Sequence, residues 1–263
     1  MQSRQTNIYF FSGTGNTYLA AQKIKRVFEE NENEVNLIRI EKSQPQSVDL
    51  SNTVGIAFTV ACWNAYPFVR EFIQNMPQAF GTEAFVFCTM GNNSLKAAAN
   101  VGSILKDKGY KVTATKGFIM PNNFLGIQGE QRNKKTTEFT YAKIERFARD
   151  ILNETSKPEN TNFILKFFFA ISAFVTNLWK TALFQKILNL KITKDLCVKC
   201  GFCAQICPTQ NIEMRGYPFF KGKCQICLRC SSYCPQKAIS SLAVIGGKTY
   251  KALDLETAKN VFI

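Results

Sequence analysis

The C-terminal part of this chain contains one cysteine pattern twice, and no other feature of the sequence restricts its fold as strongly. Each run has the spacing C-x2-C-x2-C-x3-C-P, and every cysteine of the first run recurs 27 residues later in the second. The first run comprises Cys197, Cys200, Cys203, Cys207 and Pro208, and the second comprises Cys224, Cys227, Cys230, Cys234 and Pro235. Ile212 and Ile239 are related by the same offset, so this segment is an internal duplication.

The spacing within each run predicts two iron–sulfur clusters. Three thiolates separated by two residues each can wrap one loop around a [4Fe–4S] cubane, whereas the fourth cysteine points away and serves the other cluster. We therefore expect one cluster on Cys197, Cys200, Cys203 and Cys234, and a second on Cys224, Cys227, Cys230 and Cys207. The proline after each run ends any local helix, and Gly201 lets backbone approach the sulfurs closely.

Zinc is the alternative occupant, and the sequence argues against it. Zinc sites usually pair one C-x2-C with a second pair across a longer loop, and many include histidine. The chain has no histidine at all, which also excludes Rieske centres and histidine-ligated haem. The first residues lack the apolar stretch of a signal peptide, so we expect a cytoplasmic, reducing location. We interpret Cys62 and Cys88 as core or loop residues.

Residues 192–239, which contain both runs, resemble a bacterial two-cluster ferredoxin. The resemblance implies a small domain that carries single electrons at low potential. Four basic residues near the cysteines would raise the cluster potentials by favouring the more negative reduced form, unless they form an ordinary solvated surface. They are Lys199, Lys221, Lys223 and Arg229.

The N-terminal part alternates apolar stretches typical of strands with stretches typical of helices. Strands are expected at 8–11, 35–40, 54–60, 83–89 and 110–120, and helices at 16–30, 67–76, 94–108 and 133–153. Five strands that alternate with helices predict an α/β fold with a five-stranded parallel, flavodoxin-like sheet and helices on both faces.

A glycine loop follows the first expected strand and opens the first expected helix. It is not a phosphate loop of the Gly-Lys-Ser/Thr kind, and Tyr18 stands where a dinucleotide fingerprint needs glycine. Hydroxyls, backbone N–H groups and the helix dipole favour a phosphate here, although a simple helix-capping turn is the alternative. The loop comprises Ser12, Gly13, Thr14, Gly15, Asn16 and Thr17.

In a flavodoxin-like order this loop would hold the phosphate of FMN, and two later loops would hold the flavin ring. The loop after the third strand offers Trp63 and Tyr66, and we expect Trp63 to stack on the ring rather than pack elsewhere. The loop after the fourth strand offers backbone and amide groups for the polar edge of the ring. Its residues are Thr89, Met90, Gly91, Asn92 and Asn93.

The whole chain is similar to a family of flavodoxin–ferredoxin fusion proteins of anaerobic microbes. The order of parts is the same, and residues 120–124 (MPNNF) resemble the segment that borders the flavin in that family. The resemblance implies a flavodoxin-like FMN domain at 1–155, a helical connector at 156–190 and a two-cluster ferredoxin domain at 191–263. The chain departs from the family in having VACW and TMGNN beside the expected ring, where relatives carry more aromatic residues or glycine.

Residues 163–190 are strongly apolar, and we interpret them as helices that pack between the two domains. The longest run without charge, 167–179, would span roughly 20 Å as a helix against a hydrocarbon core of roughly 30 Å, so no transmembrane span is expected. Contact with a membrane surface or with a second copy stays open as the alternative.

The net charge of +14 is spread along the chain without a dense basic run, so we expect no nucleic-acid partner. We interpret the chain as an electron-transfer protein that relays electrons between FMN and two clusters and to or from a protein redox partner. The alternative is an FMN-dependent reductase of a small molecule, fed by its own clusters. A membrane-associated adaptor is a third hypothesis. No nicotinamide site is present in the sequence.

Overall fold

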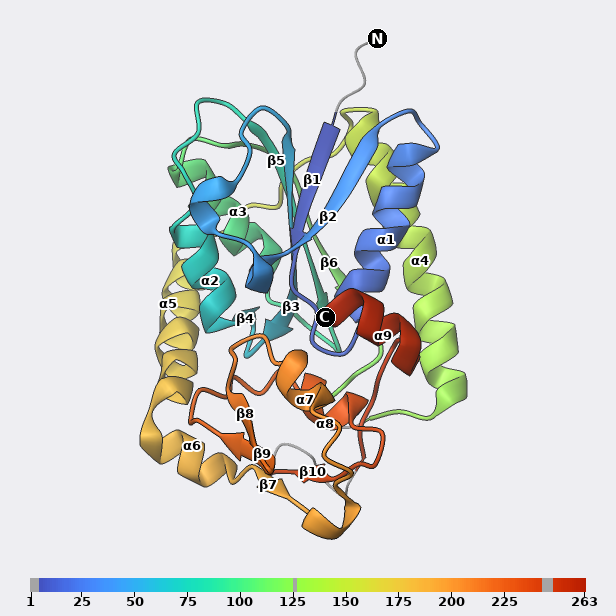
Figure 1. Ribbon diagram of the computed structural model, residues 1–263. Helices are drawn as coiled ribbons and strands as arrows, with labels where there is room; N and C mark the ends of the chain where they lie inside the picture. Colours follow the sequence, from blue (N-terminus) through green and yellow to red (C-terminus); the bar gives the residue numbers. More distant parts are fainter. Residues whose placement is uncertain (1–4, 125–126, 243–247) are drawn as a thin grey trace. The chain divides into compact units, whose positions relative to one another are not determined.

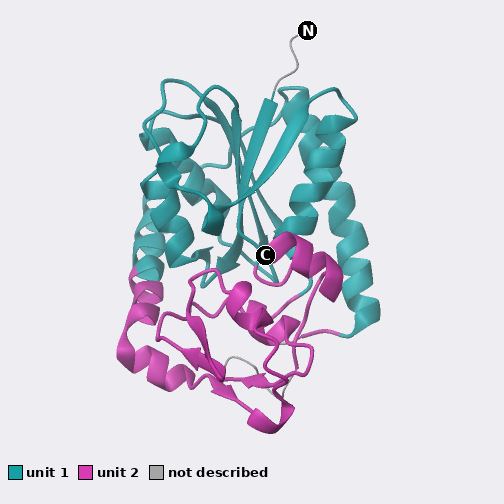
Figure 2. Ribbon diagram, viewed as in Figure 1, with its two compact units in different colours: residues 1–12, 16–121, 129–173 teal, residues 13–15, 122–128, 174–263 magenta. Residues whose placement is uncertain are grey.

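A computed structural model of the protein describes residues 5–124, 127–242 and 248–263. These residues fall into two compact units, coloured teal and magenta in Figure 2. Unit 1 contains residues 1–12, 16–121 and 129–173, and unit 2 contains residues 13–15, 122–128 and 174–263. The domain limits expected after residues 155 and 190 stay predictions.

Unit 1 is built on a parallel sheet with the strand order β2-β1-β3-β5-β6 (Figure 1). The strands are β1 (Gln5–Phe10), β2 (Glu34–Arg39), β3 (Thr53–Ala61), β5 (Glu83–Met90) and β6 (Lys111–Ile119). A short strand, β4 (Asn64–Ala65), pairs antiparallel with the end of β3. This is the flavodoxin-like order, so the predicted fold class of this part is confirmed.

Helices cover both faces of the sheet, which explains why its central strands are almost wholly apolar. In Figure 1, α1 and α4 lie on one face, and α2 and α3 lie on the other. Their bounds are α1 (Asn16–Glu29), α2 (Pro67–Gln74), α3 (Ala97–Asp107) and α4 (Glu130–Leu152). Between β2 and β3 lie two short 3-10 helices, η1 (Ile40–Lys42) and η2 (Pro45–Ser47).

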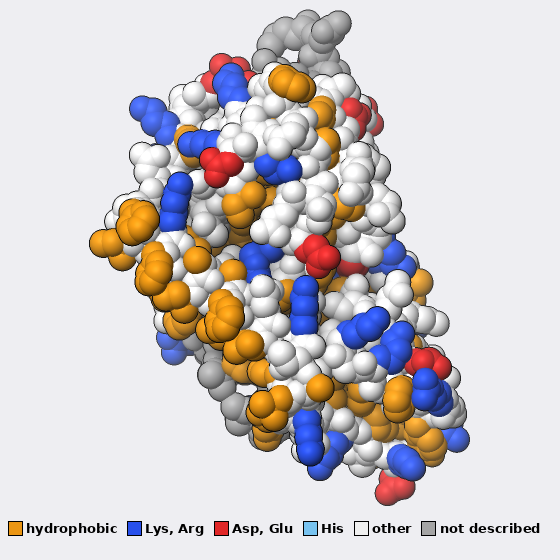
Figure 3. Space-filling model, turned by 90° about the vertical axis from the view of Figure 1, so that its left-hand side faces the viewer, with side chains coloured by type: hydrophobic (Ala, Val, Ile, Leu, Met, Phe, Trp, Pro, Cys, Tyr) orange, Lys and Arg blue, Asp and Glu red, His pale blue; other side chains and the backbone are white. Residues whose placement is uncertain are grey.

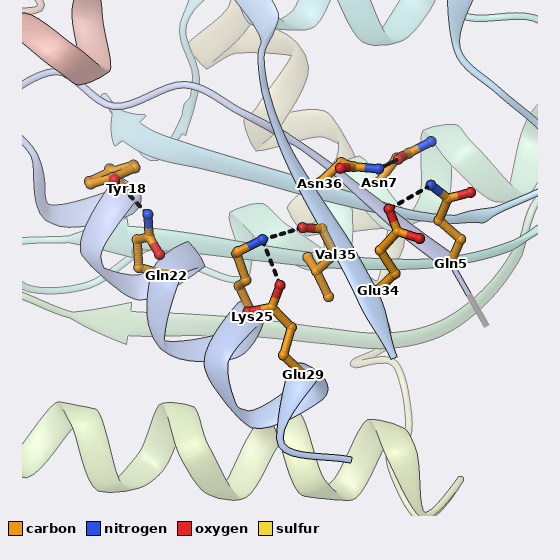
Figure 4. Close-up of polar contacts among 9 residues, drawn as sticks. All are labelled: Gln5, Asn7, Tyr18, Gln22, Lys25, Glu29, Glu34, Val35 and Asn36. Atoms are coloured by element: carbon orange, nitrogen blue, oxygen red, sulfur yellow. Dashed lines mark hydrogen bonds and ion pairs between the residues drawn. The ribbon is translucent and has the colours of Figure 1, made fainter. Parts of the chain in front are cut away.

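Polar contacts fix α1 against the edge strand β2 (Figure 4). Lys25 donates from Nζ to the carbonyl oxygen of Val35 at 2.5 Å, and the same nitrogen lies 2.7 Å from a carboxylate oxygen of Glu29. Asn36 donates to the side-chain oxygen of Asn7 at 3.2 Å. The Lys25 contact with Val35 ties α1 to β2, and the Asn36 contact with Asn7 ties β2 to β1.

Residues 163–190 form three short helices rather than one long one. They are α5 (Phe163–Asn177), the 3-10 helix η3 (Leu178–Lys180) and α6 (Ala182–Leu188). Thr181 caps α6 by accepting a hydrogen bond from the backbone N–H of Phe184. The predicted helical character of this segment is confirmed.

Unit 2 contains the cysteine runs in short elements. The strands β7 (Lys191–Ile192) and β10 (Ile239–Ser240) pair with each other, and β8 (Ile212–Arg215) pairs with β9 (Tyr217–Phe220). The helices are η4 (Lys194–Leu196), α7 (Phe202–Gln205), α8 (Arg229–Tyr233) and α9 (Leu255–Phe262).

The backbone repeats the duplication seen in the sequence. Positive φ angles recur at the same 27-residue offset, in the pairs Lys199 and Ile226, Gly201 and Leu228, and Gln210 and Lys237. Helices α7 and α8 begin at equivalent positions, and the repeated Ile212 and Ile239 pack together with Cys203 in one buried cluster. The two runs are therefore two copies of one local structure.

Candidate functional site

Four cysteines from both runs line one cavity in unit 2. The cavity is small, with a volume of about 20 Å³, and it opens to solvent. Its sulfur-bearing residues are Cys197, Cys200, Cys203 and Cys234. Burial, together with smaller contributions from Cys234, Cys200 and Cys197, raises the pKa of Cys203 to about 11. The structure thus brings together the set that the sequence predicts for the first cluster.

The pKa values of the other four cysteines also depend on one another. Burial, with a smaller contribution from Cys207, raises the pKa of Cys224 to about 11 and that of Cys227 to about 12. Burial raises the pKa of Cys230 well above its ordinary value, and Cys227, Cys224, Cys207 and Cys203 add to that effect. Cys207 therefore acts on the first three cysteines of the second run, and their grouping as the ligands of one cluster stays a prediction.

The donor set fits an iron–sulfur cluster better than a single metal ion. Among the described residues, no three Cys, Asp or Glu side chains converge closely enough to hold one ion. Zinc needs four ligands at roughly 2.0–2.3 Å from a common centre, whereas a cubane keeps its four cysteines further apart. Buried thiols with raised pKa values must also lose protons when a metal binds, so metal binding is coupled to proton release and depends on pH.

Backbone N–H groups point at several of these sulfurs. Asn211 donates to Sγ of Cys207 at 3.3 Å, and at the equivalent position Ala238 donates to Sγ of Cys234, also at 3.3 Å. Ile226 donates to Sγ of Cys224 at 3.4 Å. Such hydrogen bonds stabilise negative charge on thiolates and help set a cluster's potential.

Arg229, between two cysteines of the second run, is only 1% exposed. It donates from one guanidinium nitrogen to the carbonyl oxygen of Ile206 at 3.0 Å, and its guanidinium carbon lies 4.1 Å from the ring centroid of Phe262. Its charge lowers the pKa of Cys227 against the larger effect of burial. The solvated-surface interpretation is therefore wrong for Arg229, whereas Lys199, Lys221 and Lys223 are exposed.

The C-terminal helix α9 was not expected to take part in this region. Phe262 covers the Arg229 guanidinium, and the ring of Tyr233 packs edge-on against Phe262 at 5.5 Å. Asp254 caps α9 by accepting a hydrogen bond from the backbone N–H of Thr257 at 2.8 Å. The capping residue followed by LETAKNVF is the sequence signal that could have indicated this helix.

The glycine loop, 12–17, is buried along its whole length. In unit 1, the hydroxyl of Thr17 forms hydrogen bonds with the hydroxyls of Thr59 at 2.9 Å and Thr89 at 2.7 Å. Asn16 donates from its amide to the carbonyl oxygen of Pro121 at 2.8 Å. The structure therefore brings Thr89 and the start of segment 120–124 to the loop, as the sequence predicts.

The middle of the loop, Gly13–Gly15, belongs to unit 2. The carbonyl oxygen of Thr14 accepts from the Tyr233 hydroxyl at 2.8 Å and from the backbone N–H of Ala252 at 2.7 Å. The Thr14 hydroxyl accepts from the side-chain amide of Asn123 at 3.0 Å. Tyr233 immediately precedes a cysteine of the second run, and sequence analysis had not assigned it a role.

Both loop glycines are required by what lies beside them. A Cβ atom at Gly13 would lie 2.7 Å from the carbonyl oxygen of Cys227. Gly15 has a φ of +107°, and a Cβ there would lie 2.7 Å from the side chain of Leu253. The loop thus packs directly against the second cysteine run.

The loop's chemistry fits a phosphate. It offers the hydroxyls of Ser12, Thr14 and Thr17 at the N-terminus of a 14-residue helix whose first turn has no acidic residue. The Thr14 and Thr17 hydroxyls have protein partners in this structure, so binding would exchange some of those hydrogen bonds.

The residues expected to hold a flavin ring are more exposed than the loop. Trp63 is 47% exposed, adopts a φ of 61° and packs edge-on against Phe168 of α5 at 5.6 Å. Gly91, Asn92 and Asn93 are exposed, and Met90 is half-buried. Sequence analysis missed the contact of Phe168 with Trp63, and the expected stacking of Trp63 on a flavin stays a prediction.

Comparison with known proteins agrees with the cysteine chemistry. A family described as a 4Fe-4S binding domain matches residues 190–213, which contain the first run. No curated protein sequence matches the chain.

Among solved structures, three flavodoxins illustrate the likeness of unit 1. The flavodoxin of Megasphaera elsdenii is 19% identical with a TM-score of 0.39, covering 52% of this chain and 98% of that one. The flavodoxin of Streptococcus pneumonia TIGR4 is 14% identical with a TM-score of 0.42, covering 57% and 99%. A short-chain flavodoxin associated with a non-canonical PDU bacterial microcompartment is 13% identical with a TM-score of 0.44, covering 59% and 100%. The flavodoxin-like fold of unit 1 is shown by its strand order and does not depend on these scores.

Proposed function

We propose that this protein relays electrons between FMN and two [4Fe–4S] clusters, and to or from a protein redox partner in the cytoplasm. The observation that carries the proposal is that Cys197, Cys200 and Cys203 of the first run line one cavity together with Cys234 of the second run. A structural role would need only one such centre, whereas two neighbouring centres form an electron path. The flavodoxin-like sheet and the 4Fe-4S binding motif both support electron transfer.

In this proposal each cluster takes three cysteines from one run and one from the other. The first is held by Cys197, Cys200, Cys203 and Cys234, and the second by Cys207, Cys224, Cys227 and Cys230. The backbone N–H groups that point at Cys207, Cys224 and Cys234 would stabilise the charge on those ligands.

The glycine loop would hold the FMN phosphate through its hydroxyls and the N-terminus of α1. The ring would lie at the loops that contain Trp63 and residues 89–93. When bound, FMN exchanges one or two electrons and each cluster exchanges one. The contact of Gly13 with the carbonyl of Cys227 supports a direct connection between the flavin loop and the second cysteine run. The order of parts is that of the flavodoxin–ferredoxin fusion proteins that the sequence resembles.

A small-molecule reductase is the second candidate function. The observation in its favour is that Trp63 and the loop 91–93 are exposed, so a small substrate could reach the ring edge. Reoxidation of the reduced protein by a small molecule, without a protein partner, would favour this candidate over the relay.

The first test is a visible spectrum with iron and flavin counts on anaerobically purified protein. We expect one FMN and eight irons per chain, with reduction of the flavin followed by reduction of the clusters. Iron without flavin would remove FMN from the proposal and leave a ferredoxin joined to a flavin-free sheet domain.

A variant tests the packing of the loop against the second cysteine run. Gly13→Ala places a methyl group against the carbonyl of Cys227, a proposed cluster ligand, and should lower the flavin content several-fold together with the iron held by the second run. Gly129→Ala is the matched control, because a Cβ there meets nothing within 4 Å. Equal flavin content in the two variants would contradict the role of the loop.

A further inference from the structure

Most of the large apolar side chains of α5 are exposed, while its Ser and Thr side chains are buried. Phe163 is 84% exposed and Phe174 is 67% exposed, whereas Ser172 and Thr176 are buried. We call the exposed set the outer face of α5; it comprises Phe163, Ile164, Phe167, Ile171, Phe174, Val175 and Leu178. A helix of a water-soluble domain normally has the reverse arrangement, so this face requires an explanation.

Hydrogen bonds explain why the polar side of α5 faces unit 1. Asn64 donates from its amide to the carbonyl oxygen of Phe169 at 3.2 Å, and Ser172 donates from its hydroxyl to the carbonyl oxygen of Cys62 at 2.5 Å. Arg70 reaches the carbonyl oxygen of Ala173 at 3.3 Å. Burial lowers the pKa of Arg70 to about 10, so its guanidinium stays charged at neutral pH.

These contacts argue against a membrane-crossing α5, which is one way in which a bilayer could cover the outer face. Residues 163–180 are long and apolar enough to cross a membrane by length and composition alone. A crossing helix would have to leave Asn64 and Arg70, which are buried beside the end of β3 and in α2. Departure of α5 would break the hydrogen bonds from Asn64 and Arg70 to the carbonyl oxygens of Phe169 and Ala173, so we expect α5 to meet a bilayer along its surface.

The charged residues in and after α5 indicate what kind of partner covers the outer face. From 160 to 194 the sequence has no Asp or Glu, and all five of its lysines are exposed: Lys166, Lys180, Lys186, Lys191 and Lys194. Figure 3 shows hydrophobic side chains gathered on this face of the molecule, with basic side chains among and beside them. In α6, Leu183 and Ile187 are also exposed.

We propose that the outer face of α5 binds the surface of an anionic lipid bilayer, with its phenylalanines in the interface and the neighbouring lysines on the headgroups. Apolar area plus basic charge is the combination that such surfaces recognise. A second copy of the chain is a poorer occupant, because a symmetric contact would bring the same lysines of both copies together. The proposal is independent of the relay, since it uses none of the cluster or flavin residues.

The test is flotation of the full-length, anaerobically purified protein with lipid vesicles. One set contains phosphatidylcholine alone, and the other contains equal parts of phosphatidylcholine and phosphatidylglycerol. We expect binding to the second set, much weaker binding to the first, and a decrease as salt rises.

Two variants address the two components of the proposed surface. Phe163→Ser with Phe167→Ser and Phe174→Ser should abolish binding, whereas Phe80→Ser with Phe139→Ser, which alters exposed phenylalanines elsewhere, should leave it unchanged. Lys180→Gln with Lys186→Gln should weaken binding on the order of 20-fold, since each basic residue near an anionic surface contributes roughly a factor of five. The cluster spectrum of each variant reports whether it has folded.

Three outcomes would overturn the proposal. The first is no binding to either vesicle set, and the second is binding that the phenylalanine variant retains. The third is a concentration-dependent dimer that the same variant dissociates, which would assign the face to a second copy. Loss of vesicle binding with normal iron content would leave the relay unaffected.

Discussion

The two cysteine runs share a backbone but differ in what surrounds it. Phe202 of the first run is buried in an apolar setting, and the equivalent position of the second run holds the buried Arg229. Likewise Ile206 corresponds to Tyr233, whose hydroxyl reaches the carbonyl of Thr14. The first run therefore uses these positions for packing, while the second uses them to place a charge and to contact the glycine loop.

This difference indicates how a duplication can produce two unequal redox centres. The ligand spacing and the positive φ angles are fixed by the cluster, so they repeat. The residues between the ligands are free to diverge, and in the second run they connect with α9 and with Gly13–Gly15. We expect the second centre to be the one coupled to the flavin loop, and the first to be the one nearer to solvent.

The largest predicted effect tests whether the runs exchange their last ligand. Cys207→Ser should remove the cluster held mainly by the second run and leave the other, so that iron content falls by about half. Cys234→Ser should do the reverse. Electron paramagnetic resonance of the reduced protein distinguishes the two remaining clusters, and Cys62→Ser, outside both sets, is the control.

If each substitution instead removed the cluster bound mainly by its own run, then each run would bind one cluster alone. The proposed exchange of the last ligand between the runs would then be wrong. The cavity lined by Cys197, Cys200, Cys203 and Cys234 would then have no bearing on the bound state.

The next effect concerns the buried charge of the second run. Arg229→Gln should lower the potential of the second cluster, because a positive charge stabilises the more negative reduced form. A charge at roughly 8–12 Å with an effective dielectric constant of about 20 contributes about 1.5–2 kcal/mol, equivalent to roughly 60–90 mV for one electron. A redox titration followed by electron paramagnetic resonance measures this shift.

Two further variants separate charge from packing. Arg229→Lys retains the charge and should recover most of the potential, while Lys223→Gln removes an exposed charge and should shift the potential less. A shift for Lys223→Gln as large as that for Arg229→Gln would show that burial does not strengthen the effect.

The same contrast shows what the sequence could and could not predict. Ligand spacing, strand periodicity and the glycine loop are local patterns, and the strand periodicity predicted the parallel sheet, whereas the grouping of the eight cysteines into two ligand sets stays a prediction. The burial of Arg229 depends on Phe262, which lies far along the chain and has no periodic signal linking it to the cysteines. The outward face of α5 was also missed, because its apolar composition is the same whether the side chains point inward or outward.

The smallest predicted effect concerns the turn shared by both runs. Gly201 has a φ of +71°, and the equivalent Leu228 adopts a φ of 60° despite its side chain. A Cβ at Gly201 would meet only the Met214 side chain at 3.8 Å, so Gly201→Ala encounters no collision. Its cost should be that of the left-handed backbone alone, about 1–2 kcal/mol, measured as a lower denaturant midpoint for loss of the cluster absorbance. A much larger loss would mean that glycine there serves the cluster through close backbone approach, and that the second run accommodates Leu228 only because its surroundings differ.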